Sequence, residues 1–582
     1  MAEILLLDLA YRQSLGLRAL QHELRKQGIS CEIIDLTGEV RKGTKVFGTT
    51  IESLGPQKSI SVIKEKLLQL RPQIEKAKFL GISFVAQSDD AAIRVPVASF
   101  LKETFPHKIL IGGGPGITSD AQKFFKHAKL DYAIKGEGEK ALPKLINAVK
   151  KRDLQKIEAI EGIVLSRKGK IIEAQRPALL TKQEVSRLPF ITAQGDMKGE
   201  VITYTERGCP NACIFCSAPR KGIPAQLSEK TIIKGIIKLS KNPQVTSIHF
   251  IDDQLFSDKE RAKRIIQKII SLKLNKRFAF RAMATVDSLL KNGQVDTEFI
   301  NLIKRARFDC VWMGTESLNN NILREVKSGR YTAQQAIKVA DALTAAKIKT
   351  GNFMLAGGME TRAKDFLKSY YSAMSRTLRR KSYYTQLGMI EARGKSPLLA
   401  KAAKEGHVYT AEGKVNPAKT SLLTSQVIMP KDPVLREYFL THLKNRGTAV
   451  ALQHISGVID LSKKVEGEKA GQRGSMTRKL QKLQGRMCEI GAANKRAEKH
   501  FLDEIAFAEC KRRYGKITQK TVDKLAKDKE FIKRALEKSK NMARQYQKEA
   551  KRIQQQKGIQ RLHTMKRIRT RFGISGFSGM RK

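Results

Sequence analysis

Three cysteines within eight residues constrain this chain more than any other feature. Cys209, Cys213 and Cys216 form a Cys-x3-Cys-x2-Cys pattern in a chain of 582 residues that has only seven cysteines. Chance produces such a pattern in about one chain in a thousand of this length. A structural zinc site needs four ligands at characteristic spacing, and no Cys or His follows Cys216 before His249. Three thiolates can instead hold three irons of a [4Fe-4S] cluster and leave the fourth iron open.

The length and composition are those of a globular protein with two or more domains. Apolar residues make up 41% of the chain, which is typical of folded rather than disordered proteins. The few cysteines, most of them without an evident pairing partner, favour a reducing compartment. The apolar run at residues 1–8 is too short for a signal peptide or a membrane helix. We therefore expect a cytoplasmic protein without a membrane span.

Residues 1–150 alternate short apolar runs with helical stretches, which predicts an α/β fold with a doubly wound parallel sheet. The expected strands are residues 4–8, 31–35, 79–85, 108–112 and 132–134, and the expected helices are residues 15–27, 61–71, 91–104 and 140–150. Ligands of such sheets bind beyond the carboxyl ends of the strands, where glycine-rich segments stand at residues 112–114 and 136–139. Glycines after strands are also common in plain turns, and spacing alone leaves both readings open.

A second alternation occupies residues 196–395. Its expected strands are residues 201–204, 247–251, 278–282, 310–313, 351–355 and 385–389. Six strands with helices between them predict a partial (β/α)6 barrel, whose chemistry lies at the carboxyl ends of its strands. Capping-box signals precede two of the helices, at Ser257 to Glu260 and at Thr332 to Gln335. A hairpin is expected at residues 162–172, in the connector between the two alternations.

Polar residues and glycines accompany these barrel strands. They are Asp252, Asp253, Arg281, Glu316, Ser317, Gly357 and Glu360. A carboxylate after a strand is often only a helix cap, but four such groups on one rim are harder to explain in that way. Cys310 stands inside an apolar strand and is expected to be a core residue. His249 is expected to be structural rather than catalytic.

The cysteine spacing resembles the signature of the radical S-adenosylmethionine superfamily. In that family the open iron binds S-adenosylmethionine, and the reduced cluster cleaves this cofactor to a 5'-deoxyadenosyl radical. The resemblance implies that Cys209, Cys213 and Cys216 are the cluster ligands. It implies contacts to S-adenosylmethionine for Phe215, Asp252, Asp253, Arg281, Glu316, Ser317, Gly357 and Glu360. It also implies a reductant of the ferredoxin or flavodoxin type as a partner.

Residues 80–83, 111–115 and 131–139 resemble the cobalamin-binding domain that precedes the radical core in many members of this superfamily. The resemblance implies cobalamin contacts for Ser83, Gly113, Gly114, Gly136 and Glu137. Other cobalamin proteins ligate cobalt through the histidine of an Asp-x-His-x-x-Gly motif, but the corresponding residues 8–13 contain no histidine. This departure fits cobalamin without a lower protein ligand, and it equally fits a domain that has lost cobalamin.

The resemblance covers residues 1–410 and gives the expected domain organisation. We expect a cobalamin-binding-like Rossmann-type domain at residues 1–150, a connector at 151–195, the radical core at 196–410, a closing segment at 411–460 and a basic helical tail with a disordered end at 461–582. The tail has 35 lysines and arginines against 12 aspartates and glutamates. Such a charge suits RNA through counterion release, although a solvated basic helix explains it equally well.

Three functions from different classes stay open. The first is cobalamin-dependent methylation of an unactivated carbon through a substrate radical. The second is a cobalamin-free radical cyclisation, oxidation or rearrangement, and a radical enzyme of either kind could act on RNA delivered by the tail. The third is a non-enzymatic RNA- or ribosome-associated protein, against which the intact cysteine loop speaks. A tRNA methylthiotransferase is disfavoured, because only Cys31 precedes Cys209 and a second cluster needs more ligands.

Overall fold

A computed structural model describes most of the chain up to residue 492. The described residues are 2–9, 14–36, 45–46, 49–50, 56–84, 88–174, 176–194, 199–217, 220–379, 383–392, 396–410, 412–416, 426–446, 455–466, 475–492, 528 and 534–535. The chain forms two compact units. The main unit comprises Met1–Arg41, Gly55–Thr361 and Ser382–Lys431, and the helical unit comprises Lys42–Leu54, Arg362–Lys381 and Asp432–Lys582.

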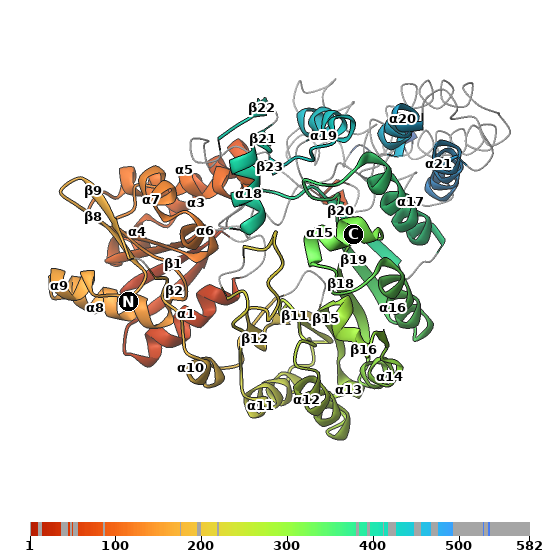
Figure 1. Ribbon diagram of the computed structural model, residues 1–582. Helices are drawn as coiled ribbons and strands as arrows, with labels where there is room; N and C mark the ends of the chain where they lie inside the picture. The colour runs from red at the N-terminus through yellow and green to blue at the C-terminus, as the bar shows by residue number, and fades with distance from the viewer. Residues whose placement is uncertain are drawn as a thin grey trace. The chain divides into compact units, whose positions relative to one another are not determined.

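The first sheet of the main unit has seven strands in the order β2-β1-β5-β6-β7-β8-β9 (Figure 1). The parallel strands are β1 (Ile4–Asp8), β2 (Cys31–Asp35), β5 (Phe79–Ser83), β6 (Ile109–Gly113) and β7 (Tyr132–Ile134). An antiparallel hairpin of β8 (Ile163–Arg167) and β9 (Lys170–Glu173) extends the sheet, with Tyr132 opposite Leu165. The predicted parallel sheet is confirmed, and the hairpin expected in the connector continues it.

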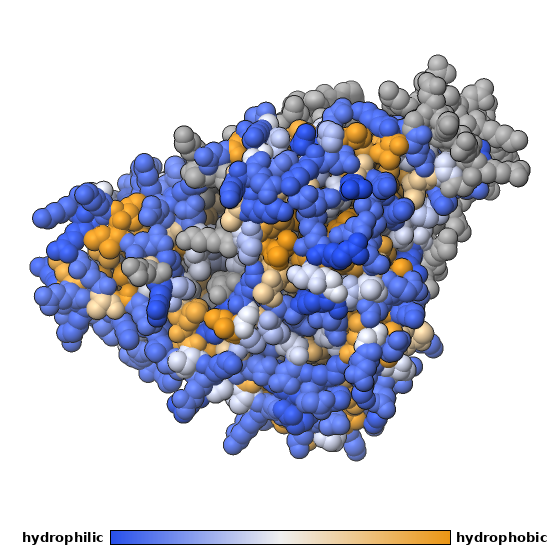
Figure 2. Space-filling model, viewed as in Figure 1, coloured by the Kyte–Doolittle hydropathy of each residue, from blue (hydrophilic) through white to orange (hydrophobic). Residues whose placement is uncertain are grey.

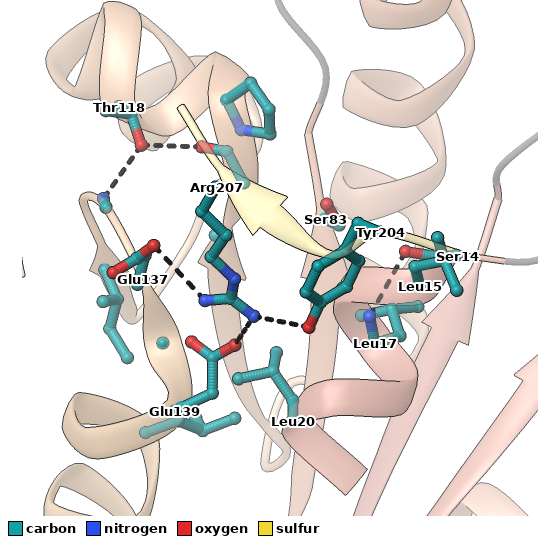
Figure 3. A pocket seen from close by; sticks show the side chains of 18 of the residues that line it. Ser14, Leu15, Leu17, Leu20, Ser83, Thr118, Glu137, Glu139, Tyr204 and Arg207 are labelled. Carbon is teal, nitrogen blue, oxygen red and sulfur yellow. Dashed lines mark hydrogen bonds and ion pairs between the residues drawn. The ribbon is translucent and has the colours of Figure 1, made fainter. Parts of the chain in front are cut away.

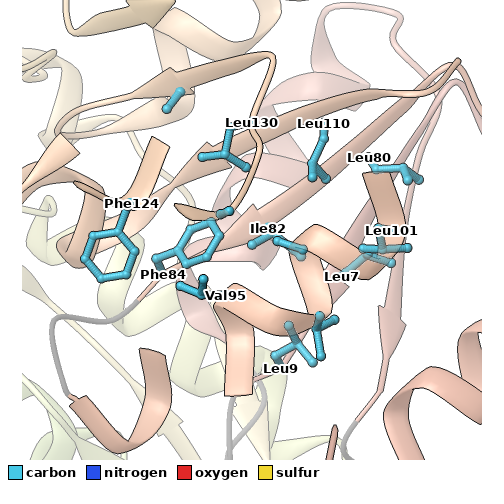
Figure 4. Close-up of a cluster of buried hydrophobic side chains, with 14 of the residues drawn as sticks. Leu7, Leu9, Leu80, Ile82, Phe84, Val95, Leu101, Leu110, Phe124 and Leu130 are labelled. Atoms are coloured by element: carbon cyan, nitrogen blue, oxygen red, sulfur yellow. The ribbon is translucent and has the colours of Figure 1, made fainter. Parts of the chain in front are cut away.

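Both faces of this sheet are covered by helices. They are α1 (Leu15–Lys26), α3 (Pro56–Gln69), α4 (Arg71–Lys76), α5 (Ser88–Thr104), α6 (Gly114–Ser119), α7 (Ala121–His127) and α8 (Gly138–Lys150). Side chains alternate along a strand, so Leu5 and Leu7 enter the cluster around Phe84 (Figure 4). Ile4 and Leu6 enter the cluster on the other face. Each such fully buried side chain contributes about 1.5–3 kcal/mol.

The second sheet of the main unit begins after α9 (Leu154–Glu158) and α10 (Lys182–Ser186). Its strands, in spatial order, are β10 (Thr192–Gln194), β11 (Glu200–Thr203), β14 (Ser247–Phe250), β15 (Ala279–Thr285), β18 (Phe308–Glu316), β19 (Lys349–Leu355) and β20 (Tyr383–Gly388). The six strands from β11 to β20 are parallel, and β10 is antiparallel to β11. The prediction of six parallel strands is confirmed. Their carboxyl ends therefore share one edge, which positions the site.

The helices and short strands of this half follow the strands in turn. They are β12 (Glu206–Arg207), β13 (Ala225–Gln226), α11 (Glu229–Ser240), α12 (Lys259–Ser271), α13 (Leu274–Arg277), β16 (Leu290–Lys291), β17 (Gln294–Val295), α14 (Thr297–Arg305), α15 (Asn320–Lys327), α16 (Ala333–Ala345), α18 (Pro397–Glu405), β21 (Val408–Thr410), β22 (Gly413–Lys414) and β23 (Val427–Ile428). Hydrophilic residues cover most of the face over α11 and α12 (Figure 2).

One of the two predicted capping boxes is confirmed and the other is wrong. Thr332 and Gln335 cap α16 reciprocally, as predicted. At α12 the cap is Asp258, whose carboxylate accepts from the backbone N–H of Arg261 at 3.0 Å. Ser257, the predicted cap, instead donates its hydroxyl to the Glu206 carboxylate at 3.2 Å. A carboxylate one residue further along competes successfully, because aspartate caps a helix at least as well as serine.

The helical unit is built from α17 (Ala363–Arg379), α19 (Pro433–Arg446), α20 (Ile455–Glu466) and α21 (Met476–Ala492), with a short pairing of β3 (Lys45–Val46) and β4 (Thr49–Thr50). The rings of Phe366 and Phe439 meet edge to face, with centroids 5.5 Å apart. Leu480 and Leu483 of α21 are buried, so the sparse apolar residues of this basic stretch complete a core shared with α17 and α20. The rest of the tail, apart from residues 528, 534 and 535, lies outside the described residues. No helix of the described part is long and apolar enough to cross a membrane.

Candidate active site

The three predicted cluster ligands lie in a loop whose two ends are pinned together. The backbone N–H of Gly222 donates to the carbonyl of Cys209 at 2.8 Å, and Cys209 pairs with Lys221 in an isolated bridge. Gly208 has φ +83°, and a Cβ there would lie 2.4 Å from the Cβ of Arg220. Only glycine allows this close crossing of the two ends. The cysteine loop, residues 209–221, is therefore a closed loop that follows β11 and β12 at the carboxyl edge of the second sheet.

The cysteine side chains are partly buried among hydrogen-bonding groups. The Cys209 thiol donates to Oε1 of Gln254 at 3.5 Å, and Arg330 donates to the Cys213 sulfur at 3.4 Å. Burial raises the pKa of Cys209. Among the described residues, no three His, Cys, Asp or Glu side chains converge on the position of a single metal ion. In a [4Fe-4S] cluster each thiolate binds a different iron, so its ligands surround a volume and do not meet at one point.

The residues after the second barrel strand support the start of this loop. Oδ1 of Asp252 accepts from the backbone N–H groups of Thr205 and Glu206, each at 2.6 Å. Burial raises the pKa of Asp252 to about 6. Asp253 lines a cavity described below. Gln254 accepts from the side-chain amide of Asn211 at 2.6 Å, which ties the cysteine loop to this strand end.

Glu316 and Phe215 meet through a lysine that the sequence did not single out. Glu316 ends β18 at a register shift and has φ +54°. Such a conformation is costly for a residue other than glycine and marks a position under constraint. The Tyr331 hydroxyl donates to the carbonyls of Gly314 and Thr315 and holds this turn. Nζ of Lys327 lies 3.0 Å from Oε1 of Glu316 and 5.6 Å from the Phe215 ring centroid.

The glycine motif after β19 lies close to the same aromatic residue. Met359 and Phe215 belong to one hydrophobic cluster. Gly357 has φ +124°, and the neighbouring Gly358 donates its N–H to the Thr361 hydroxyl at 2.9 Å. Glu360 does not enter this cluster with its side chain. Its carboxylate is 47% exposed and pairs with Lys401 and Lys431 at 3.1 and 2.7 Å.

Ser317 and Arg281 complete the residues predicted to contact S-adenosylmethionine. Ser317 is fully buried, and its hydroxyl accepts from the backbone N–H of Asn319 at 3.1 Å. Arg281 lies near the amino end of β15, where it pairs with Glu200 and Asp309 at 2.9 and 3.0 Å. The structure thus brings the cysteine loop, Phe215 and Glu316 together at the carboxyl edge, and it places Arg281 towards the opposite end of the sheet. Cys310 is buried, as expected for a core residue, and burial raises its thiol pKa to about 12. Nδ1 of His249 lies 3.9 Å from Oε1 of Glu200, and the structural role of His249 stays a prediction.

A cavity of about 550 Å³ lies between the first sheet and the start of the second (Figure 3). Its walls include the predicted cobalamin contacts Ser83, Gly113, Gly114, Gly136 and Glu137. From the other side, its walls include Tyr204, Glu206, Arg207, Gly208, Asp252 and Asp253. The five residues predicted for one ligand are therefore brought together, and the same cavity reaches the base of the cysteine loop.

Two adjacent glycines on the cavity wall, Gly113 and Gly114, differ in whether the structure around them requires glycine. Gly114 has φ +88°, and a Cβ there would lie 2.5 Å from the Ser83 hydroxyl, so packing within the chain requires glycine. Gly113 has an extended backbone with φ −155°, which any residue can adopt. The nearest atom to an added Cβ at Gly113 is the Ile134 carbonyl oxygen at 3.9 Å. Neither strain nor packing within the chain requires glycine at position 113, and the missing side chain leaves this part of the cavity wall open to close approach by a ligand.

The sequence did not reveal the charged residues around the cysteine loop. They are Glu139, Glu206, Arg207, Arg220, Lys327 and Arg330. Glu206 is buried, and burial together with the nearby Asp252 raises its pKa to about 8. One sequence signal existed for Lys327, since it follows the buried Leu323 by four residues and therefore lies on the apolar face of α15. The partners of the other residues are distant in sequence.

Residues 204–369 match the family model described as the radical SAM superfamily. A curated relative, the anaerobic magnesium-protoporphyrin IX monomethyl ester cyclase of Synechocystis sp., is 24% identical over 254 residues, which cover 41% of this chain and 48% of the relative. The chain thus spans about half the length of that relative, and 58% and 59% of the next two.

Two solved structures share most of the fold. The radical S-adenosylmethionine methyltransferase TsrM of Kitasatospora setae, solved with cobalamin and a [4Fe-4S] cluster, has a TM-score of 0.57 at 13% identity and covers 80% of this chain and 90% of its own. The cobalamin-dependent radical enzyme OxsB, solved with aqua-cobalamin and S-adenosylmethionine, has a TM-score of 0.58 at 16% identity and covers 98% of this chain and 84% of its own. Residues 204–369 therefore form a radical SAM superfamily domain, within a fold that is similar to that of cobalamin-dependent radical SAM enzymes.

Proposed function

We propose that this chain is a radical S-adenosylmethionine enzyme that methylates an unactivated carbon with the help of cobalamin. The observation that carries the proposal is the cavity whose walls come from both sheets. A ligand in it would contact Gly113 and Gly136 after strands of the first sheet, and Arg207 and Gly208 beside the cysteine loop. A methyl donor held there would face the loop from which the radical chemistry starts.

The chain's own residues fit the implied cofactors. Cys209, Cys213 and Cys216 would hold a [4Fe-4S] cluster, and residues 83, 113, 114 and 136 would line the cobalamin site. In enzymes of this kind the cluster and S-adenosylmethionine supply a radical that removes a hydrogen atom from the substrate, while cobalamin supplies the methyl group. A substrate radical is needed because an unactivated carbon has no nucleophilic electron pair for ordinary methyl transfer.

Several residues would prepare the site for these groups. Arg330 donates a hydrogen bond to the Cys213 sulfur, and contacts of this kind tune the reduction potential of a cluster. Asp252 fixes the backbone before the loop through two hydrogen bonds. Phe215 offers an apolar ring beside Met359, where the adenine of S-adenosylmethionine would pack. Reduction would come from a ferredoxin- or flavodoxin-type partner.

A second function is a radical cyclisation or oxidation without cobalamin. The cyclase relative, which matches over 254 residues, favours a cyclisation as the reaction. The absence of histidine from residues 8–13 is compatible with both functions. The cavity would then hold substrate in place of a methyl donor. The two functions differ in whether the reconstituted protein retains cobalamin.

The deciding experiment is anaerobic reconstitution of the full chain with iron, sulfide and hydroxocobalamin. Bound cobalamin, iron content and release of 5'-deoxyadenosine from S-adenosylmethionine are then measured. Near-stoichiometric cobalamin together with 5'-deoxyadenosine supports the methyltransferase. Release of 5'-deoxyadenosine without bound cobalamin favours the second function. If no cluster forms and S-adenosylmethionine is not cleaved, both functions are overturned.

A further inference from the structure

Two carboxylates of the first half of the main unit reach the cysteine loop of the second half. Glu137 stands at the N-cap position of α8, shortly after β7, and Glu139 lies in the first turn of this helix. The sequence marked this stretch as a glycine-rich strand end and, by resemblance, marked Glu137 as a cobalamin contact. Nε and NH2 of Arg220 donate hydrogen bonds to the two carboxylate oxygens of Glu137, at 2.8 and 2.7 Å. NH2 of Arg207 donates to Oε1 of Glu139 at 2.5 Å (Figure 3). NH1 of Arg207 also lies 3.3 Å from Glu137.

These four side chains are buried and their hydrogen-bonding capacity is largely used. None of them is more than 15% exposed. The Glu137 carboxylate also accepts from the backbone N–H of Leu180 at 2.7 Å, so it has little capacity left for a ligand. Arg207 donates to the Tyr204 hydroxyl at 2.9 Å and stacks over its ring at 5.1 Å. Bidentate arginine–carboxylate pairs fix direction as well as distance.

The two arginines stand at the two ends of the cysteine loop. Arg207 precedes Gly208 and the first ligand Cys209, and Arg220 follows the last ligand Cys216 by four residues. The backbone hydrogen bond from Gly222 to Cys209 closes the loop between them. Each end of the loop is thus attached by an ion pair to one short segment of the other sheet. The same segment and both arginines also line the cavity.

We propose that Glu137 and Glu139 are positioning residues that hold both ends of the cysteine loop through Arg207 and Arg220. The inference deepens the proposed function, because it assigns to residues of the first half a role in shaping the cluster site. It assigns Glu137 to the loop and not to direct contact with a cavity ligand. Residues that orient metal ligands in this way typically change metal affinity or activity by about 10–100-fold when they are replaced.

The test compares Glu137→Gln, Glu139→Gln and Arg220→Gln with a matched control. Glu200→Gln is the control, because it breaks a similarly buried ion pair, to Arg281 at 2.9 Å, towards the amino end of the second sheet. Hydrogen exchange of the cofactor-free full chain is followed in peptides that cover residues 208–222. The positioning role predicts exchange at least about tenfold faster in that segment for Glu137→Gln and Glu139→Gln, with strands β5 and β6 unchanged. Glu200→Gln should leave residues 208–222 at the wild-type rate.

Two further measurements separate positioning from general support of the fold. In the double variant Glu137→Gln with Arg220→Gln, residues 208–222 should exchange no faster than in the faster-exchanging of the two single variants. The effects of substitutions at the two residues of one ion pair are not additive. Glu137→Asp, which keeps the charge, should recover part of the protection. After reconstitution, the electron paramagnetic resonance spectrum of the reduced Glu137→Gln enzyme should contain more than one cluster species, whereas that of Glu200→Gln should match the wild type.

Unchanged exchange at residues 208–222 in both glutamate variants would overturn the proposal. Acceleration that spreads equally over the whole main unit would overturn it as well, since that result describes loss of stability and not loss of position. The exchange measurement needs no cofactor, so its result stands whether or not the chain binds cobalamin. Failure of the cluster to form in the wild type would contradict the proposed function. The exchange result would still test whether Glu137 and Glu139 position the cysteine loop.

Discussion

Lys327 and Glu316 form a buried ion pair beside the aromatic ring of the cysteine loop. Their side chains are 3% and 9% exposed, and Nζ and Oε1 lie 3.0 Å apart. Although burial alone would lower the pKa of Lys327, the charges of Glu316 and Cys213 hold it above the ordinary value. The lysine therefore carries a positive charge at the centre of the candidate site.

Lys327→Met should destabilise the main unit strongly. Removing one partner of a buried ion pair leaves an uncompensated charge and typically costs about 3–5 kcal/mol. Thermal unfolding measures the effect, and the double variant with Glu316→Gln should recover part of the loss because no charge is then left unpaired. The control is Lys263→Met at the more exposed pair with Glu260, for which about 0–1 kcal/mol is expected. Equal losses for both lysines would contradict the buried role of Lys327.

Cys213→Ala should abolish the cluster, because only two of its three thiolate ligands remain. Iron and sulfide content after anaerobic reconstitution should fall to background, and release of 5'-deoxyadenosine should be lost. Cys310→Ala provides the control, since this buried thiol lies in β18 and should leave the iron content unchanged. A Cys213→Ala protein that still carries a full cluster would show that the ligands have been assigned wrongly.

Gly113→Val should weaken cobalamin binding without unfolding the protein. Its branched side chain would project into the cavity, where an extra methylene group is typically worth about 10–200-fold in affinity. Bound hydroxocobalamin after reconstitution measures the loss, and the melting temperature of the free protein should stay near that of the wild type. Gly113→Ala should have a smaller effect. Full retention of cobalamin by the valine variant would place the ligand away from this wall.

Glu206→Gln should change how stability depends on pH. The pKa of Glu206 is about 8 in the folded protein, against an ordinary value of about 4.3 in an unfolded chain. Between these values the folded carboxyl is protonated while the unfolded one is ionised, so its contribution to stability is full below the lower value and is lost as the pH rises towards 8. The slope is at most about 1.4 kcal/mol per pH unit.

Melting temperatures between pH 6.5 and 8 measure this dependence. The wild type should lose stability over that range, and Glu206→Gln should lose less of it because glutamine does not titrate. Glu260→Gln, at an exposed position, should follow the wild-type profile. Parallel profiles for the wild type and Glu206→Gln would mean that Glu206 is ionised in the folded protein.

Local sequence signals predicted the bounds of several strands correctly where the apolar pattern of the segment itself marks a buried strand. The expected strands at residues 4–8, 31–35 and 132–134 have the bounds of β1, β2 and β7. Helix α6 was missed, because Gly114 and Pro115 at its start are also typical of a turn. Its position depends on the close approach to Ser83 and Phe84, which the local sequence does not contain.

The sequence proposes the cluster ligands of the candidate site but does not indicate its ion pairs. Cysteine spacing is a local property, and so Cys209, Cys213 and Cys216 could be proposed from the sequence alone. The partners of Glu137 lie 70 and 83 residues away, on either side of the three cysteines. Tertiary packing determines which of the many arginines pairs with Glu137, and no periodicity in the sequence indicates that partner. The sequence therefore grouped Glu137 with other residues that line the cavity, but it did not indicate its arginine partners.

The β8–β9 hairpin has a consequence for how much of the chain is needed for a soluble first half. It covers the edge of β7, with Ala133 opposite Val164 and Ile134 opposite Ile163. A fragment that ended at residue 150 would leave β7 as an open edge with unpaired backbone groups, which other chains can join. During synthesis, too, that edge stays available for wrong partners until the whole of β8, which ends at Arg167, has left the ribosome.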